Sequence, residues 1–327
     1  NSTFRKEFRM TEVIQLEKKV YSPWAYTENE SEKSKINYEL YKVFYYVATS
    51  LSFSEASKQL YISQSAVSQS IKTLEKRLNQ NLFIRSTKKV RLTPEGEILL
   101  RHIEPAINLI QRGENQILEA NTLGGGQLRI GASDTICRYF LVPYLSKFHK
   151  AYPNVHIKVT NQTSPGCVDL LENGQVDFIV TNYPNSRISN TNRIHTIKKF
   201  QDVFAANRNF FDLEGKEFSF EELLDYPILM LDRQSTTSEF LHHLFLQHEL
   251  DLVPEIELSS NDLLLDLANI GLGIAFIPDY LLTEERPDMY PLKLKEALPE
   301  REIVIVTSDS IPLSPAAREF IKFFQEN

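Results

Sequence analysis

The segment SFSEASKQLYISQSAVSQSIKTLE, residues 52–75, constrains the fold of this chain more than any other stretch. Ser52, followed by Glu55 three residues later, and Ser63 are predicted helix N-caps, so two short helices joined by a tight turn are expected. Apolar residues recur at helical spacing and are expected to form the inward face. They are Leu60, Ile62, Val67, Ile71, Leu74 and Leu78. This pattern predicts a helix-turn-helix.

The second predicted helix carries a polar strip without an acidic residue. Helix-turn-helix proteins that read DNA place their base-contacting side chains near the N-terminal end of this helix. Gln can form two hydrogen bonds with adenine in the major groove, and Ser can bond to several base edges. The alternative is an ordinary pair of helices with a solvated polar face. The predicted DNA contacts on this helix are Gln64, Ser65, Ser68, Gln69 and Lys72.

Residues 82–96, LFIRSTKKVRLTPEG, predict a basic β-hairpin, or wing. Two short stretches with β character, 82–85 and 90–92, bracket a turn at 86–89. Basic side chains there suit phosphate contacts, which position a protein on the duplex without reading its sequence. A solvated charged hairpin is the alternative. The wing residues expected at DNA are Arg85, Thr87, Lys88 and Lys89, with Arg91 beside them.

These motifs, QSAVSQSIKTLEKRL followed by LFIR and LTPEG, resemble the LysR-type transcriptional regulators, and the resemblance extends from about Ile36 to the C-terminus. It implies a winged helix-turn-helix, a linker helix and an effector domain similar to a periplasmic binding protein. In that family Gln64, Ser68 and the wing would contact double-stranded DNA. Ser65 stands where a proline is frequent and Gln69 where an arginine is frequent, so the operator sequence is not carried over from the family.

A long helix is predicted after Thr93, because Thr93 can cap it and Pro94 suits its first position. Apolar residues at spacings of three and four continue to Leu123, and the run Gly124–Gly126 is expected to end the helix and act as a hinge. A small neighbouring domain covers little of such a stripe, so the expected partner is the same helix of a second copy. A homodimer is therefore expected, and a homotetramer of two dimers is the further expectation.

After the hinge, strand-like and helix-like segments alternate, which predicts α/β architecture. The segments fall into two sets, so two doubly wound lobes are expected, with a ligand in the crevice at the carboxyl ends of their strands. The first set has strands at 128–130, 155–159 and 178–180 and helices at 138–151 and 166–173; the second has strands at 228–231, 256–258 and 274–277 and helices at 236–248 and 261–270. The family resemblance implies that a C-terminal strand, 302–307, and helix, 316–325, return to the first lobe.

The predicted organisation is an N-terminal extension at 1–35, a winged helix-turn-helix domain at 36–93, a linker and dimerisation helix at 94–123, a glycine hinge at 124–126 and an effector-binding domain at 127–327. The first lobe is expected at about 127–200 and 293–327, and the second at about 201–292. Residues 1–35 are interpreted as a disordered arm, with docking of Trp24 and Tyr26 on a neighbouring surface as the alternative.

Strand-to-helix junctions nominate the residues of the crevice. Hydroxyls and free amides at helix N-termini form an anion site, so a small carboxylate-bearing metabolite is expected. Simple N-capping by these hydroxyls is the alternative. Asp134 would repel a dianion and could pair with the amino group of an amino acid or amine, unless it is a helix-capping carboxylate that faces away. The predicted effector contacts are Ser133, Asp134, Thr135, Thr163 and Ser164, with Gln234 and Ser235 closing from the second lobe.

Cys137 and Cys167 each lie just inside a predicted helix start, where the helix dipole would favour a thiolate. A thiol-based redox sensor is therefore an alternative to metabolite sensing. The usual role of a free cysteine is that of a small buried hydrophobe. A constitutive DNA-binding protein whose α/β part has lost its ligand is a further alternative.

Composition and the remaining motifs argue against other classes. Residues 36–101 hold ten Lys and Arg against five Asp and Glu in a chain of net charge −7, so affinity for nucleic acid is expected to be local. The segment 271–281 lacks a GxGxxG pattern, the histidines at 242, 243 and 248 lack metal-ligand spacing, and no catalytic motif is found. No cofactor, metal or enzymatic activity is therefore expected. Two cysteines, no apolar run near 18 residues and no signal peptide favour a reducing cytoplasm without membrane contact.

Overall fold

The structure is a computed structural model that describes residues 36–85, 89–120 and 125–324. It consists of two compact units, one ending at Ile103 and one beginning at Glu104. The predicted N-terminal arm with Trp24 and Tyr26, the wing residues Thr87 and Lys88, and Gly124 of the expected hinge lie outside the described residues.

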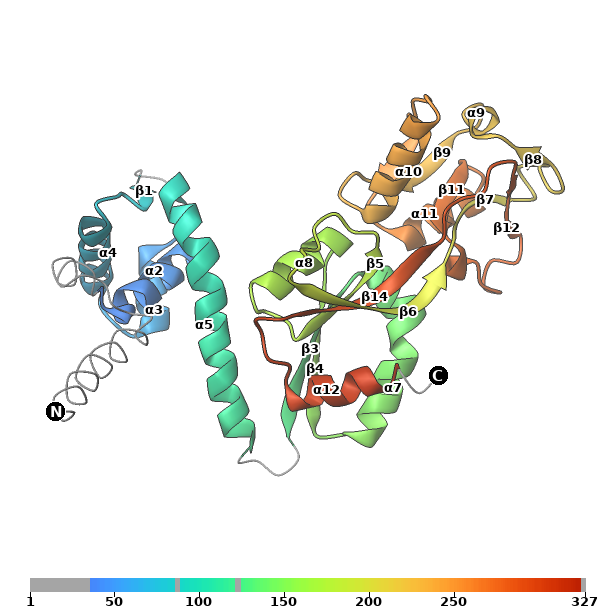
Figure 1. The fold of residues 1–327 in the computed structure, drawn as a ribbon. Coiled ribbons are helices and arrows are strands. Elements are labelled where there is room, and N and C mark those ends of the chain that lie inside the picture. The colour runs from blue at the N-terminus through green and yellow to red at the C-terminus, as the bar shows by residue number, and fades with distance from the viewer. Residues whose placement is uncertain (1–35, 86–88, 121–124, 325–327) are drawn as a thin grey trace, which may run out of the picture. The chain divides into compact units, whose positions relative to one another are not determined.

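The first unit contains a helix-turn-helix and a β-hairpin (Figure 1). Its elements are α2 (Tyr38–Ser50), α3 (Phe53–Leu60), α4 (Gln64–Leu78), β1 (Phe83–Arg85) and β2 (Val90–Leu92). Both predicted N-caps are confirmed, since the Ser52 hydroxyl accepts the backbone N–H of Glu55 at 3.2 Å and the Ser63 hydroxyl accepts that of Ala66 at 3.2 Å. Helices α3 and α4 therefore begin directly after the serines that the sequence indicates as caps.

The core of this unit contains most of the predicted inward face. Val67, Ile71 and Leu74 of α4 are completely buried with residues of α2 and α3, and Leu60 and Leu78 are partly buried against them. The prediction for Ile62 was wrong, because its side chain is 40% exposed. Ile62 lies in the turn between α3 and α4, where helical spacing no longer determines the direction of a side chain.

Helix α5 (Pro94–Ala120) begins where the sequence predicts. The Thr93 hydroxyl accepts the backbone N–H of Gly96 at 3.0 Å and donates to the Asn81 carbonyl at 2.7 Å. Gly96 allows a close approach to the hairpin, since a Cβ there would lie 2.2 Å from the carbonyl oxygen of Leu82. The first turns of α5 therefore belong to the core of the first unit, where Leu99, Leu100 and Ile103 pack.

The later turns of α5 belong to the second unit and are anchored to it by Arg112. Arg112 is 4% exposed, donates to the Val176 carbonyl at 2.8 Å and pairs with the Asp177 carboxylate at 2.5 Å. The same carboxylate accepts the backbone N–H of Arg129 at 2.8 Å. A buried charge needs such partners, because a buried charge without a partner strongly destabilises the fold.

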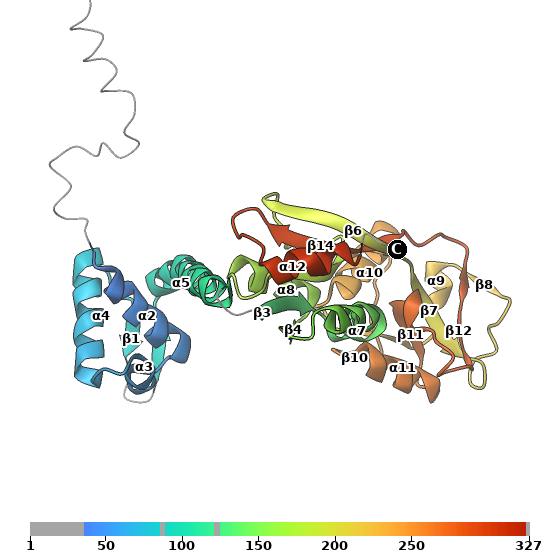
Figure 2. The same cartoon turned by 90° about the horizontal axis from the view of Figure 1, so that it is seen from below.

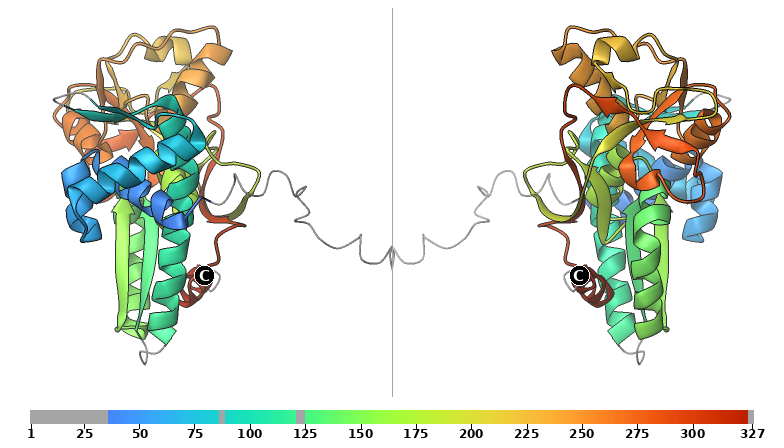
Figure 3. Two further views of the ribbon diagram at one scale, coloured as in Figure 1. Left: turned by 90° about the vertical axis from the view of Figure 1, so that its left-hand side faces the viewer. Right: turned by 90° about the vertical axis from the view of Figure 1, so that its right-hand side faces the viewer.

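The second unit has two lobes (Figure 3), and each is built on a five-stranded sheet. The sheet orders are β4-β3-β5-β14-β6 and β10-β9-β11-β7-β12. In both, the first three strands are parallel and each of the last two is antiparallel to its predecessor. The first-lobe strands are β3 (Gly126–Ala132), β4 (Val155–Asn161), β5 (Phe178–Tyr183), β6 (Asn192–Phe200) and β14 (Arg301–Ser308). The second-lobe strands are β7 (Asp202–Asn207), β9 (Ile228–Leu231), β10 (Ile256–Leu258), β11 (Ile274–Pro278) and β12 (Met289–Pro291).

Helices cover both faces of each sheet, and the apolar cores lie between the layers (Figure 2). On one face of the first sheet lie α6 (Asp134–Ile136), a π-helical stretch (Cys137–Leu141), α7 (Val142–Ala151) and α12 (Pro315–Lys322), with α8 (Ser164–Glu172) on the other. On one face of the second sheet lie α9 (Phe220–Leu223) and α10 (Thr236–Gln247), with α11 (Asn261–Asn269) on the other. Two doubly wound lobes are therefore present, as the alternating segments predict. Within the described ranges, no helix has both the length and the apolar character needed to span a bilayer.

The chain crosses between the lobes twice, and the two crossings meet at a buried ion pair. Asp202 begins β7 and Arg301 begins β14, and their side chains are 2.8 Å apart with exposures of 0% and 1%. The return to the first lobe comes later than predicted. Strand β13 (Lys293–Leu294) pairs with β8 (Glu217–Phe218) beside the second-lobe core, so the first-lobe segment starts at Arg301 rather than at about residue 293.

Candidate DNA-contacting surface and interlobe pocket

Helix α4 turns its polar strip outward. Gln64, Ser65, Gln69 and Lys72 are exposed and Ser68 is half-buried, on the side away from the apolar core. The Ser65 hydroxyl lies 2.9 Å from that of the N-cap Ser63. The structure therefore leaves all five predicted side chains at the surface of one helix, in reach of a duplex groove. Their contact with bases stays a prediction.

The wing is fixed to the same helix. Strands β1 and β2 pair antiparallel, with Phe83 opposite Leu92. The Glu75 carboxylate of α4 accepts the backbone N–H of Leu82 at 2.8 Å and of Phe83 at 3.3 Å. At the hairpin, Lys89 and Arg91 are exposed. Arg85 is the last residue of β1. The other two predicted wing contacts, Thr87 and Lys88, lie outside the described residues.

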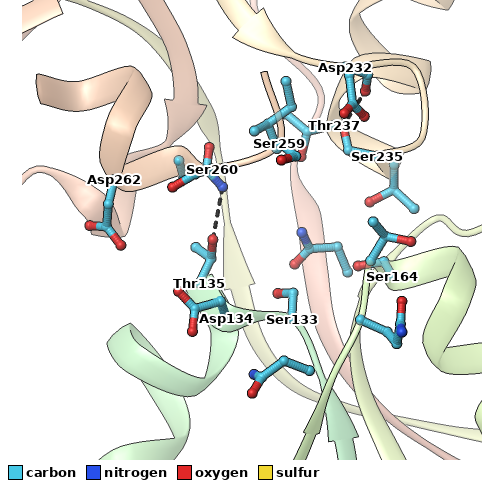
Figure 4. A pocket seen from close by; sticks show the side chains of 17 residues that line it. Ser133, Asp134, Thr135, Ser164, Asp232, Ser235, Thr237, Ser259, Ser260 and Asp262 are labelled. Atoms are coloured by element: carbon cyan, nitrogen blue, oxygen red, sulfur yellow. Dashed lines mark hydrogen bonds between the residues drawn. The ribbon is translucent and has the colours of Figure 1, made fainter. Parts of the chain in front are cut away.

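A cavity of about 250 Å³ lies between the two lobes. Figure 4 shows first-lobe residues such as Ser133 and Ser164 facing second-lobe residues such as Asp232 and Thr237 across it. Six of the predicted effector contacts line this interlobe pocket: Ser133, Asp134, Thr135, Thr163, Ser164 and Ser235. Gln234 does not line it. Its side chain is exposed, and its backbone N–H donates at 3.0 Å to the carboxylate of Asp232, which does line the pocket.

Hydroxyl groups start the helices that point into the pocket. Ser133, Thr163, Ser235 and Ser260 each accept the backbone N–H three residues further on, at 3.0–3.3 Å. Capping, the alternative role for the predicted hydroxyls, is therefore present at Ser133, Thr163 and Ser235 and not at Thr135 or Ser164. It does not exclude ligand binding, since a hydroxyl that accepts can also donate. Ser235 already donates to the Asp232 carbonyl at 3.1 Å.

Sequence reasoning missed several residues of the lining. Among them are Asn161, Asn182, Asp232, Thr237, Ser259, Ser260, Asn261 and Asp262. The junction after β10, SSND at 259–262, has the same strand-to-helix position as the nominated junctions, so the same rule would have found it. Asn182 is the penultimate residue of β5, which no helix follows directly, and a polar residue near the carboxyl end of a buried run was its signal.

The electrostatics of the pocket are acidic. Asp134, Asp232 and Asp262 line it, and the described lining contains no Lys, Arg or His. Asp262 accepts a hydrogen bond from the Tyr139 hydroxyl at 2.5 Å and lies 3.5 Å from the Arg138 guanidinium. Burial, aided by this hydrogen bond, raises the pKa of Tyr139, so the phenol stays protonated as a donor.

Arg301 ties one wall of the pocket to the lobe crossings. It donates to the hydroxyls of Thr236 at 3.1 Å and Thr237 at 3.2 Å, both of which line the pocket. Its guanidinium also lies over the rings of Phe200 and Phe240. Burial raises the pKa of Asp202, and the positive charge of Arg301 opposes that rise. The start of α10 is thereby linked to the strands that connect the lobes.

The two cysteines are poor thiolates. Burial raises the pKa of Cys137 to about 11 and that of Cys167 to about 12. The prediction that helix starts would favour the thiolates was wrong, because loss of hydration outweighs the dipole at both sulfurs. Within the described residues, no group of three His, Cys, Asp or Glu side chains is arranged to hold a metal ion.

Two family descriptions match almost the whole described chain. "LysR substrate binding domain" matches residues 121–327, and "Bacterial regulatory helix-turn-helix protein, lysR family" matches residues 38–97. The chain belongs to the LysR family of transcriptional regulators. Among its LysR relatives, a "Probable RuBisCO transcriptional regulator" of Gracilaria tenuistipitata var. liui is 28% identical over 278 residues, 83% of this chain and 90% of the relative. A protein of the same description from Synechocystis is 30% identical over 245 residues, 73% of this chain and 70% of the relative.

Solved LysR-family structures share the fold. Full-length CbnR in complex with its target DNA has a TM-score of 0.63 at 18% identity, covering 89% of this chain and 99% of CbnR. A full-length OxyR variant from Pseudomonas aeruginosa has a TM-score of 0.65 at 19% identity, covering 89% of this chain and 94% of OxyR. The expected winged helix-turn-helix followed by a two-lobed α/β effector domain is thus confirmed, as is the expected class, a LysR-type DNA-binding regulator.

Proposed function

We propose that this chain is a cytoplasmic regulator that binds a specific operator through α4 and the wing, and that a small carboxylate-bearing metabolite in the interlobe pocket sets its affinity for DNA or the bend it imposes. The pocket is the observation that carries this proposal. Helix N-termini from both lobes converge on it, and their dipoles favour a negatively charged group. A ligand that contacts both lobes favours their closed arrangement, which supplies the two states that regulation needs.

We further propose a homodimer, and a homotetramer of two dimers, assembled through α5. Large apolar side chains are exposed along this helix, and Ile110 at 59% and Ile117 at 67% lie two turns apart on one face. Exposed apolar side chains of this size on one helix mark an interaction surface. A second copy would cover them and would bring a second α4 to a neighbouring half-site.

Protection of genomic DNA by the purified full-length protein tests the first part, because the protected sequence defines the operator. The effect of metabolites on that protection tests the second part. Thr163→Ala should abolish the response, whereas Thr163→Ser, which keeps both the hydroxyl and the N-cap, should retain it. A folded Thr163→Ala variant that responds normally would remove the pocket from the mechanism. Failure of every metabolite to change operator binding would favour the constitutive alternative.

A further inference from the structure

We propose that the ligand of the interlobe pocket is a small amino acid, bound as a zwitterion, with its ammonium group held by the Asp134 carboxylate and the side-chain oxygen of Asn261. This inference rests on the proposed function of the pocket and specifies the class of its ligand. Three features carry it: the sign of the lining charges, two buried acceptors without donors, and the donors at the helix starts.

The lining charges disfavour a doubly negative ligand. Arg and Lys are over-represented where proteins recognise phosphates or dicarboxylates, and the described lining offers three carboxylates instead. The nearby Arg138 is already shared between Asp262 at 3.5 Å and Glu285 at 3.9 Å. A second negative charge on the ligand would therefore meet repulsion, whereas a positive charge would be attracted.

Asp134 is the carboxylate available to that positive charge. Asp262 is bound to Tyr139 and Arg138, and Asp232 accepts the backbone N–H of Gln234. The Asp134 carboxylate makes no hydrogen bond or ion pair with the described residues, and its side chain is exposed at the pocket. An ammonium ion is the natural partner of an uncompensated carboxylate in a cleft.

Two buried amides independently indicate a donor-bearing ligand. Asn182 and Asn261 line the pocket and are only 8% and 7% exposed, yet neither side-chain oxygen accepts a hydrogen bond from the described residues. The amide nitrogen of Asn261 donates to the Thr135 hydroxyl at 3.0 Å, the dashed line of Figure 4, which leaves the oxygen as its unused atom. Buried acceptors rarely stay unsatisfied, and an ammonium group brings three donors.

The two groups proposed to hold the ammonium group, the Asp134 carboxylate and the Asn261 side-chain amide, belong to neighbouring parts of the lining. Asp134 precedes Thr135, the residue that Asn261 contacts, and the figure shows the Asp134 and Thr135 side chains beside each other. The carboxylate of the ligand can then accept hydrogen bonds from donors at the helix starts of the first lobe. These are the hydroxyls of Ser133 and Thr163 and the backbone N–H of Ser164, the first residue of the nine-residue α8.

The size of the pocket is consistent with a small-molecule ligand. A volume of about 250 Å³ is below the usual range of roughly 300–1,000 Å³ for ligand sites. A ligand of the size of an amino acid fits within this volume.

Titration calorimetry of the full-length protein tests the ligand class. The probes are the common L-amino acids, succinate and glycerol 3-phosphate, and, for each amino acid that binds, its α-hydroxy acid and its decarboxylated amine. We expect an amino acid to bind and both analogues to bind at least about tenfold more weakly, because each lacks one charged group. Tighter binding of a dianion, equal binding of the hydroxy acid, or no binding of any amino acid would overturn the proposal.

A charge variant tests the assigned partner. Asp134→Asn keeps the shape of the side chain and should weaken amino-acid binding by about tenfold to a hundredfold. Asp225→Asn makes the same change at an exposed carboxylate outside the lining and should leave the affinity unchanged. Equal affinities of the Asp134 variant and the unmodified protein would overturn the assignment. A dianion that binds and alters operator affinity would overturn the amino-acid class alone, and a responsive Thr163→Ala variant would instead refute the pocket as effector site.

Discussion

Removal of one partner of the Asp202–Arg301 pair should destabilise the two-lobed unit severely. Arg301→Met leaves the Asp202 carboxylate completely buried without its cation and deprives the hydroxyls of Thr236 and Thr237 of their donor. Breaking a buried ion pair in this way costs about 3–5 kcal/mol in unfolding free energy. For a unit of about 200 residues each kcal/mol lowers Tm by roughly 2–4 °C, so a fall of about 6–20 °C is expected.

Calorimetric melting of the full-length protein measures this effect. The double variant Arg301→Met with Asp202→Leu buries no charge and should recover most of the lost stability, because well-packed apolar residues often replace a buried pair at little cost. The matched control is the exposed pair of Lys199 and Glu300, 2.8 Å apart and adjacent along the chain to the same crossings. Glu300→Gln should change the unfolding free energy by less than about 1 kcal/mol. The reasoning would be refuted if Arg301→Met lowered the unfolding free energy by no more than Glu300→Gln does. It would also be refuted if the double variant lost as much unfolding free energy as the two single variants, Arg301→Met and Asp202→Leu, lose together.

Four further outcomes are expected. Gln64→Ala and Ser68→Ala should weaken operator binding by about 1–3 kcal/mol while sparing random duplexes, measured by competition binding; equal losses on both would show that α4 does not read bases. Lys89→Ala should reduce the log-log salt slope of DNA binding by about 0.9, and an unchanged slope would remove this wing residue from the phosphate contacts. Gly96→Ala should lower stability by about 1–3 kcal/mol in urea unfolding, because its Cβ would lie 2.2 Å from a carbonyl oxygen, whereas an unchanged midpoint would mean that α5 can shift freely. Alkylation of Cys137, followed by mass spectrometry, should be slow at neutral pH and rise about tenfold per pH unit toward the pKa of about 11, and a rate that levels off by pH 9 would contradict the raised pKa.

Local chemistry made much of the architecture predictable. Caps such as Ser63 and Thr93 are satisfied within three residues of themselves, so the sequence alone contains both donor and acceptor. The buried face of α4 follows from helical period in the same way. Strand β6 escaped prediction because it is an edge strand whose side chains are mostly exposed, and it therefore shows no apolar run.

The pocket was predictable only in part, for a related reason. Residues at strand-to-helix junctions have a local signature, and Ser133 and Thr163 were found by it. The Asp202–Arg301 pair has none, because charged residues are normally exposed and these two are 99 positions apart in the chain. The unpaired oxygens of Asn182 and Asn261 are likewise properties of the assembled lobes, since only the packing shows which polar atoms find partners.

The anchoring of Arg112 determines where this chain can be divided. A fragment that starts at the glycine run would keep Asp177 and the backbone of Arg129 but lose the guanidinium that neutralises the buried carboxylate. The effector half of a chimaera with another family member should therefore be joined within α5, near Ile103 and Glu104, so that each half keeps the turns of the helix that complete its own core.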